Sequence, residues 1–154
     1  MAAVKVFSRN TRRIIGLLLV VTLLITTFLL MPSDVVTTRY SSLAEARTKL
    51  LFTRGWLPNI LPESSKNIRT SNDLDINISE GEFEFSPQEW LSFSARLEPY
   101  SKISNPFRDY EGYILRMLEK GFIIRVHENE GTAWVFFCKS DKGYCEYQMW
   151  LKRQ

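Results

Sequence analysis

Cysteine and histidine are scarce in this sequence of 154 residues, which contains two cysteines and one histidine. A structural zinc site needs four ligands of these kinds, and a redox-active pair needs cysteines separated by two residues. Cys138 and Cys145 have six residues between them, and His127 is the only histidine. The sequence therefore predicts neither a zinc site nor a redox-active thiol pair, and we expect no cofactor.

Catalytic motifs are also missing. The sequence has no glycine-rich phosphate-binding loop and no G-x-S-x-G element between a strand and a helix. His127 lies beside Glu128 and Glu130, but a catalytic triad would also need a nucleophile at a distance that a sequence cannot give. We therefore expect a protein that is not an enzyme, and a hydrolase is the least favoured of three functional interpretations.

An excess of positive charge is confined to the start of the chain. Residues 1–13 carry four basic side chains and no acidic one, so their charge is +4. The whole chain has a formal charge of +3, so residues 14–154 sum to −1 (3 − 4). A nearly neutral domain offers no electrostatic reason to bind nucleic acid.

Charge is absent altogether from residues 14–31, IIGLLLVVTLLITTFLLM. As a helix, these 18 residues would span roughly 27 Å, close to the hydrocarbon thickness of a bilayer. They lack the polar stripe of a soluble core helix. The preceding basic residues favour a cytoplasmic N-terminus. The segment thus predicts a single-pass signal anchor in a bacterial inner membrane, with the lipid bilayer as its partner.

Two other interpretations of this segment remain open: a signal peptide that is cleaved, and a buried helix of a soluble protein. The run is longer than a usual signal peptide core, and no small-x-small cleavage site follows it. We therefore expect a cytoplasmic leader over residues 1–13, an anchor over 14–31 and a linker over 32–39. Residues 40–154 then form one periplasmic domain, large enough for a single core.

Local signals place three helices in this domain. Ser42 and Glu45 form a capping box before an apolar face, and residues 86–89 form a second one. A third helix begins near Tyr110 and is stopped by Gly121. Alternation predicts a hairpin over residues 67–85 that turns at Glu80-Gly81.

Residues 122–151 predict a meander of three strands, with turns at residues 128–131 and 140–143. The expected fold is therefore α+β. An antiparallel sheet, made from the hairpin and the C-terminal meander, is covered on one face by two or three helices.

One pattern resembles a calcium-binding loop. The residues at its positions 1, 3, 5, 7 and 12 are Asp73, Asp75, Asn77, Ser79 and Glu84. The sixth position needs glycine for a sharp turn, and Ile78 stands there. We therefore favour the solvated face of a hairpin and predict no metal site.

The pairing of the last two strands decides whether the cysteines can join. A three-residue loop pairs Ser140 with Tyr144 and puts the two thiols on opposite faces. A four-residue loop pairs Lys139 with Tyr144 and sets Cys138 across from Cys145. The second register separates apolar from polar side chains better. Since a periplasm is oxidising, we predict a disulfide between Cys138 and Cys145.

A mixed set of polar and aromatic side chains is expected on the other face of the meander. These residues are Arg125, His127, Tyr144, Glu146, Gln148 and Trp150. Such a mixture is typical of protein-contact surfaces. We predict that they form the surface for an envelope protein partner.

Residues 56–62, WLPNILP, read as an extended apolar loop because two prolines exclude a helix. The loop is expected either to cover a core or to be exposed. In the second case Trp56, Leu57, Ile60 and Leu61 could bind a small ligand or an envelope polymer, which is the alternative function.

The stretch RGWLPNILP at residues 54–62 is followed by Asn67-Ile68, by NDLD at residues 72–75 and by Gly81-Glu-Phe83. Together they resemble a group of uncharacterised, membrane-anchored bacterial envelope proteins, over about residues 40–85. The resemblance implies no activity and no functional residue. Our first interpretation is a non-enzymatic protein-binding or accessory module of an envelope assembly.

Overall fold

In a computed structural model, the residues described are 9–29, 34–49 and 51–152. The chain divides into two compact units, Met1–Ser33 and Asp34–Gln154.

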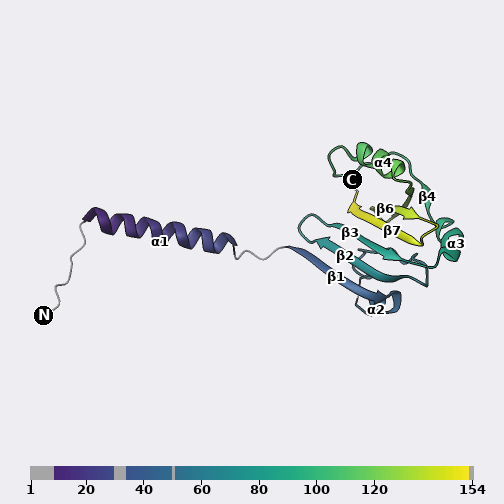
Figure 1. Cartoon of the computed structure of the whole chain (residues 1–154), viewed down its shortest axis with the longest axis horizontal. Helices are drawn as coiled ribbons and strands as arrows, with labels where there is room; N and C mark the ends of the chain where they lie inside the picture. The colour runs from purple at the N-terminus through teal and green to yellow at the C-terminus, as the bar shows by residue number, and fades with distance from the viewer. Residues whose placement is uncertain (1–8, 30–33, 50, 153–154) are drawn as a thin grey trace. The chain divides into compact units, whose positions relative to one another are not determined.

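Helix α1 spans Arg9–Leu29, drawn in purple in Figure 1. Its large apolar side chains between residues 14 and 25 are all exposed. The hydroxyl of Thr22 donates to the carbonyl oxygen of Leu18 at 2.7 Å, which satisfies this polar group within the helix. Among the described residues, no helix reaches both the length and the apolar character needed to cross a membrane. Residues 30 and 31 of the predicted anchor lie outside the described residues.

The second unit is built on one antiparallel sheet of seven strands (Figure 1). The strands are β1 (Val35–Ser42), β2 (Lys66–Asp73), β3 (Ile78–Glu84), β4 (Glu98–Pro99), β5 (Ile123–Asn129), β6 (Thr132–Lys139) and β7 (Tyr144–Leu151). Their order across the sheet is β1-β2-β3-β7-β6-β5-β4. The predicted hairpin and meander therefore join through β3 and β7. The α+β class and the antiparallel sheet are confirmed.

The helices of this unit are short. They are α2 (Leu43–Thr48), the 3-10 helix η1 (Pro87–Glu89), α3 (Trp90–Ser94) and α4 (Tyr110–Glu119). The side chain of Ser42 accepts a hydrogen bond from the backbone N–H of Glu45 at 3.2 Å, as the capping box predicts. Gly121, with φ of +78°, follows the last residue of α4 and ends it as expected.

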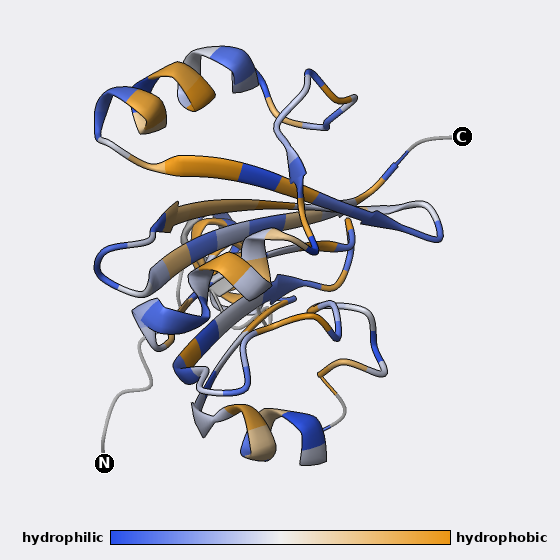
Figure 2. Ribbon diagram, turned by 90° about the vertical axis from the view of Figure 1, so that its right-hand side faces the viewer, coloured by the Kyte–Doolittle hydropathy of each residue, from blue (hydrophilic) through white to orange (hydrophobic). Residues whose placement is uncertain are grey.

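Helices cover both faces of the sheet, so the prediction of one covered face is wrong. On one face, α2, α3 and residues 51–65 pack on a first core that includes Phe83 and Phe136. On the other face, α4 packs on a second core that includes Phe137. Figures 1 and 2 show α2 and α4 on opposite sides of the sheet. The reason is that residues 133–138 of β6 are all buried, so this strand is apolar on both faces and each face needs a cover.

The turn between β2 and β3 lies at residues 74–77 and not at Glu80-Gly81, as the alternation suggested. The carboxylate of Asp73 accepts hydrogen bonds from the backbone N–H groups of residues 75 and 76, at 3.1 and 3.3 Å. Asn77 adopts the left-handed conformation, with φ of +50°. Asp and Asn favour turns for these two reasons.

The domain begins earlier than expected. Strand β1 starts at Val35 and pairs with β2 from Val35 opposite Asp73 to Ser42 opposite Lys66. Most of the predicted linker over residues 32–39 is therefore part of the sheet.

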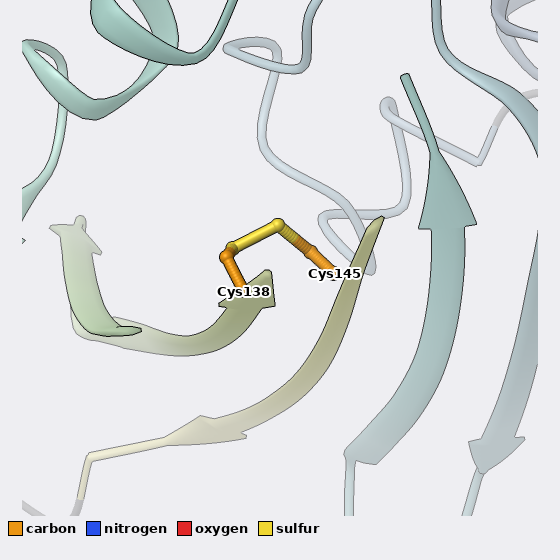
Figure 3. Close-up of a disulfide and its surroundings, with 2 residues drawn as sticks. All are labelled: Cys138 and Cys145. Atoms are coloured by element: carbon orange, nitrogen blue, oxygen red, sulfur yellow. A yellow bond between two sulfur atoms is a disulfide. The ribbon is translucent and has the colours of Figure 1, made fainter. Parts of the chain in front are cut away.

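The structure joins Cys138 and Cys145 in a disulfide, which confirms this prediction (Figure 3). Strands β6 and β7 pair Lys139 with Tyr144 and Cys138 with Cys145, the register that the four-residue loop predicts. Both cysteines are fully buried in the first core. The bond therefore joins two neighbouring strands beneath the α3 side of the sheet.

Replacing both cysteines with alanine should lower the free energy of unfolding by about 2.5 kcal/mol. This figure follows from closing a loop of eight residues, from 138 to 145, in the chain-entropy model. Urea unfolding of the full chain in detergent would measure it. Thiol labelling of the unfolded protein is the companion test: no label is expected without reductant and two labels with it. Two labels without reductant would contradict the bond.

Candidate functional site

One half of the second face of the sheet is not covered by α4 and is polar. Arg69 and Ser71 of β2, Glu80 and Glu82 of β3, and Glu146 of β7 lie there, since their partners in the ladder share this face. Two adjoining clefts, of ≈ 200 and ≈ 720 Å³, are hollowed into this half and share Arg69 and Glu82. We call them together the acidic cleft.

A single phenol joins two carboxylates in the acidic cleft. The hydroxyl of Tyr144 lies 2.8 Å from Oε2 of Glu82 and 3.3 Å from Oε1 of Glu146. Glu82 and Glu146 stand directly opposite each other on β3 and β7. Like charges in this position destabilise a sheet. Burial, the hydrogen bond to Glu82 and the charge of Glu146 together raise the pKa of Tyr144, so it remains a neutral donor.

Two further groups complete the cleft. A guanidinium nitrogen of Arg69 lies 3.8 Å from Glu82, with both side chains about half exposed. The Oε1 atom of Gln148 is buried without a hydrogen-bond partner in the described part of the chain. Buried acceptors usually have a partner. The cleft therefore offers carboxylates and an amide oxygen as acceptors, and the guanidinium as a donor.

Tyr113 reaches the acidic cleft from α4. Its ring meets Phe137 edge-on, with 5.3 Å between the centroids. Burial, followed by the charges of Glu146 and Glu80, raises the pKa of its hydroxyl. An aromatic ring beside carboxylates can contact both the aliphatic and the charged part of a basic side chain.

The structure brings together only three of the six predicted partner residues. Tyr144, Glu146 and Gln148 line the acidic cleft. Trp150 shares their face but is 1 % exposed beneath α4, so the prediction that it lies on the surface is wrong. Its indole N–H donates to the carbonyl oxygen of Ser104 at 3.0 Å.

Arg125 and His127 lie on the opposite face of the sheet. They stand across from Phe136 and Trp134, whose rings belong to the first core. The turn between β5 and β6 has two residues, Glu130 and Gly131, both with positive φ. An even number of loop residues puts Arg125 and His127 on this face of the sheet. The predicted position, on the face of Glu146 and Gln148, would need an odd number of loop residues.

The predicted ligand loop mostly covers the first core. Leu57 and Leu61 are buried there, and Trp56 and Ile60 are partly buried against it. The indole N–H of Trp134 donates to the carbonyl oxygen of Trp56 at 3.3 Å and so holds the loop down. Of the two expectations for this stretch, the structure therefore shows mainly the first, a cover for the core.

An open cleft of ≈ 630 Å³ lies between this loop and the end of β5. Leu57, Ile60, His127 and Trp134 are among its lining residues. Burial lowers the pKa of His127, and the negative charge of Glu98 partly offsets this effect. The structure thus places the only histidine beside the predicted ligand loop, which sequence spacing gave no reason to expect.

The residues of the calcium-like pattern do not converge. Ser79 is fully buried and its hydroxyl donates to the side-chain oxygen of Asn72 at 2.6 Å. No group of three or more His, Cys, Asp or Glu side chains among the described residues could hold a metal ion. Asp75 instead lies near Asp34, whose negative charge raises the pKa of the Asp75 carboxyl.

Replacing Asp75 with asparagine should therefore raise the melting temperature at pH 7. An acid whose pKa is raised by folding binds its proton more tightly in the folded state, so the native protein gains stability as the pH falls through that pKa. The advantage of the variant should disappear below about pH 3, where Asp is protonated in both states. Melting curves between pH 3 and 7 would show this. Asp34→Asn should have the same effect, and the double variant should add nothing more.

Arg69, Glu80 and Glu82 were missed as site residues. The alternation of Glu80, Glu82 and Glu84 signals an acidic strand face in the sequence. The pairing of β3 with β7 connects residues at least 60 positions apart, and no local pattern encodes it.

A family model described as the YbbD head domain matches residues 34–84. The match covers 51 of the 154 residues, from β1 to β3. No curated protein and no solved structure matches the chain. The head-domain match supports the resemblance to small bacterial proteins of an uncharacterised family, and it says nothing about membrane anchoring. Over β1 to β3 the chain is thus similar to the YbbD head domain.

Proposed function

We propose that this is a single-pass protein of the bacterial inner membrane, whose periplasmic domain binds another protein of the envelope without catalysing a reaction. The proposal takes residues 14–31 as an uncleaved anchor. Its support is the uncharged sequence, which extends two residues past the described part of α1, together with the basic leader before it.

The cysteines support an extracytoplasmic domain. Disulfides persist in oxidising compartments such as the periplasm and are rare in the cytosol. The bond between Cys138 and Cys145 is the only covalent crosslink among the described residues. A reporter enzyme fused after Gln154 tests the topology: activity in the periplasm is expected, and activity confined to the cytoplasm would overturn the proposal.

The acidic cleft is the observation that carries the binding function. It opens beside β1, which is one of the two edge strands of the sheet. Exposed edges and adjoining grooves recognise extended peptide segments, with side chains of the segment entering the groove. Five acidic side chains and two arginines line the two parts of the cleft: Glu45, Glu80, Glu82, Glu84, Glu146, Arg39 and Arg69. The partner segment that fits them is extended and carries a lysine or arginine.

A photo-reactive residue in place of Ser71 would test this function in cells. It should crosslink to one envelope protein. The double variant Glu82→Gln/Glu146→Gln should weaken this crosslink by about tenfold or more, because truncating charges in an interface costs about 2 kcal/mol or more. Glu119→Gln, an exposed residue at the end of α4, is the matched control and should leave the crosslink unchanged. A crosslink that is indifferent to the double variant would contradict the assignment of the cleft.

The cleft beside the ligand loop favours a second candidate, the binding of a small ligand or an envelope polymer. Its apolar wall and single histidine are the mixture that ligand sites use. In that case Ile60→Ser would abolish binding, whereas Glu82→Gln/Glu146→Gln would not.

A further inference from the structure

The exposed apolar side chains of the domain are unevenly distributed. Among the described residues of the second unit, eight large apolar side chains are exposed. Three of them, Leu91, Leu115 and Leu118, lie on or beside helices α3 and α4. The other five are Val35, Val36, Leu74, Ile76 and Leu151, with exposed fractions of 42 % to 61 %.

These five residues lie at one end of the sheet, which we call the apolar end. Strand register shows this: β1 begins there, β2 ends there, β3 begins there and β7 ends there. The backbone N–H of Leu74 donates to the carbonyl oxygen of Asp34 at 3.1 Å, which ties the turn to the first residue of the domain. Leu74 and Ile76 project from this turn with 46 % and 61 % of their surface exposed.

The segment that follows helix α1 in the sequence joins the domain at the apolar end. Five residue steps separate Leu29, the last residue of α1, from Asp34. Fully extended, these steps cover at most about 18 Å. With residues 14–31 in a bilayer, this short connection would keep the turn at residues 74–77 close to the lipid headgroups.

From this we infer that the apolar end is a lipid-contact surface, which inserts Leu74 and Ile76 into the interfacial region of the bilayer. The inference rests on the proposed membrane anchor and adds to it a second attachment, which would fix how the domain is presented. Two apolar side chains bind a bilayer weakly on their own, but a tether raises their effective concentration at the surface.

The charges at this end indicate the kind of lipid. Asp34, Asp73 and Asp75 surround the turn. Lys152, on the neighbouring strand end, is paired with Glu128 at 2.6 Å. An anionic surface would repel this end, so the lipid that it fits is zwitterionic.

The test uses the full chain in phosphatidylcholine vesicles whose acyl chains carry a fluorescence quencher. An environment-sensitive dye is attached to Ile76→Cys, since the native cysteines are paired. We expect a blue shift and quenching at position 76, and neither at Leu115→Cys, a control residue that is 60 % exposed on α4. Adding anionic lipid should reduce the quenching at position 76.

A third label, at Leu24→Cys within α1, separates the two proposals. Quenching at position 24 without quenching at position 76 would overturn the lipid-contact surface and leave the anchor intact. No quenching at either position would overturn both. Disulfide-linked dimers of unlabelled Ile76→Cys, without quenching of the labelled form, would show that a second copy covers this end and would also overturn the inference.

Discussion

Replacing Trp150 with alanine should lower the free energy of unfolding by about 3–5 kcal/mol, the usual cost of removing a large buried aromatic side chain. Trp150 is 1 % exposed in the second core. Its ring meets those of Phe107 and Tyr110 edge-on, with 5.5 Å between centroids in each case. Urea unfolding followed by circular dichroism would measure the loss.

Two comparisons make this result specific. Trp150→Phe keeps the ring contacts but removes the hydrogen bond to Ser104, and it should cost only about 1–2 kcal/mol. Leu91→Ala, at a residue that is 78 % exposed, should change stability by less than about 0.5 kcal/mol. If Trp150→Ala behaved like Leu91→Ala, the second core and the position of α4 would be wrong.

Replacing Gly81 with asparagine should destabilise the domain by about 3 kcal/mol or more, because the strand at this point has no room for a side chain. A Cβ atom at position 81 would lie 2.1 Å from the carbonyl oxygen of Arg69 and 2.7 Å from a ring carbon of Tyr147. The first neighbour is backbone and cannot turn aside. The same urea titration would measure the effect.

The matched control for Gly81 is Gly131→Asn in the turn between β5 and β6. Gly131 has φ of +79° and no atom within 4 Å of an added Cβ. Asparagine tolerates this conformation, so the control should cost about 1 kcal/mol or less. Equal, small losses at both positions would mean that Gly81 is a turn residue, as the alternation in the sequence suggested.

The sequence predicted what depends on near neighbours in the chain. Ser42 with Glu45 marked the start of α2, and Gly121 marked the end of α4. The faces of the last hairpin were decided by counting its loop, which placed Cys138 opposite Cys145. These features rest on hydrogen bonds and side-chain alternation within about ten residues, which a sequence records directly.

The sequence failed where distant segments compete. The apolar run in β6 is compatible with a strand that is buried on one face or on both faces. Only the position of α4 shows that both faces are buried. Because α4 packs on the second face, Trp150 is buried there, whereas Glu146 and Gln148 lie in the open acidic cleft. The acidic cleft itself was half predicted: β7 supplied three of the expected residues, but the strand that faces them, β3, could not be identified without the fold.

The pairing of β3 with β7 limits the order in which the chain can fold. Chains emerge from the ribosome with their N-terminus first. The segment matched by the head-domain model ends at residue 84, whereas the strand that closes its inner edge begins at Tyr144. The edge of β3 therefore stays unpaired until nearly the whole polypeptide has been made, and an open strand edge favours aggregation. Residues 34–84 alone should consequently behave as an incomplete unit that aggregates more readily than the whole domain.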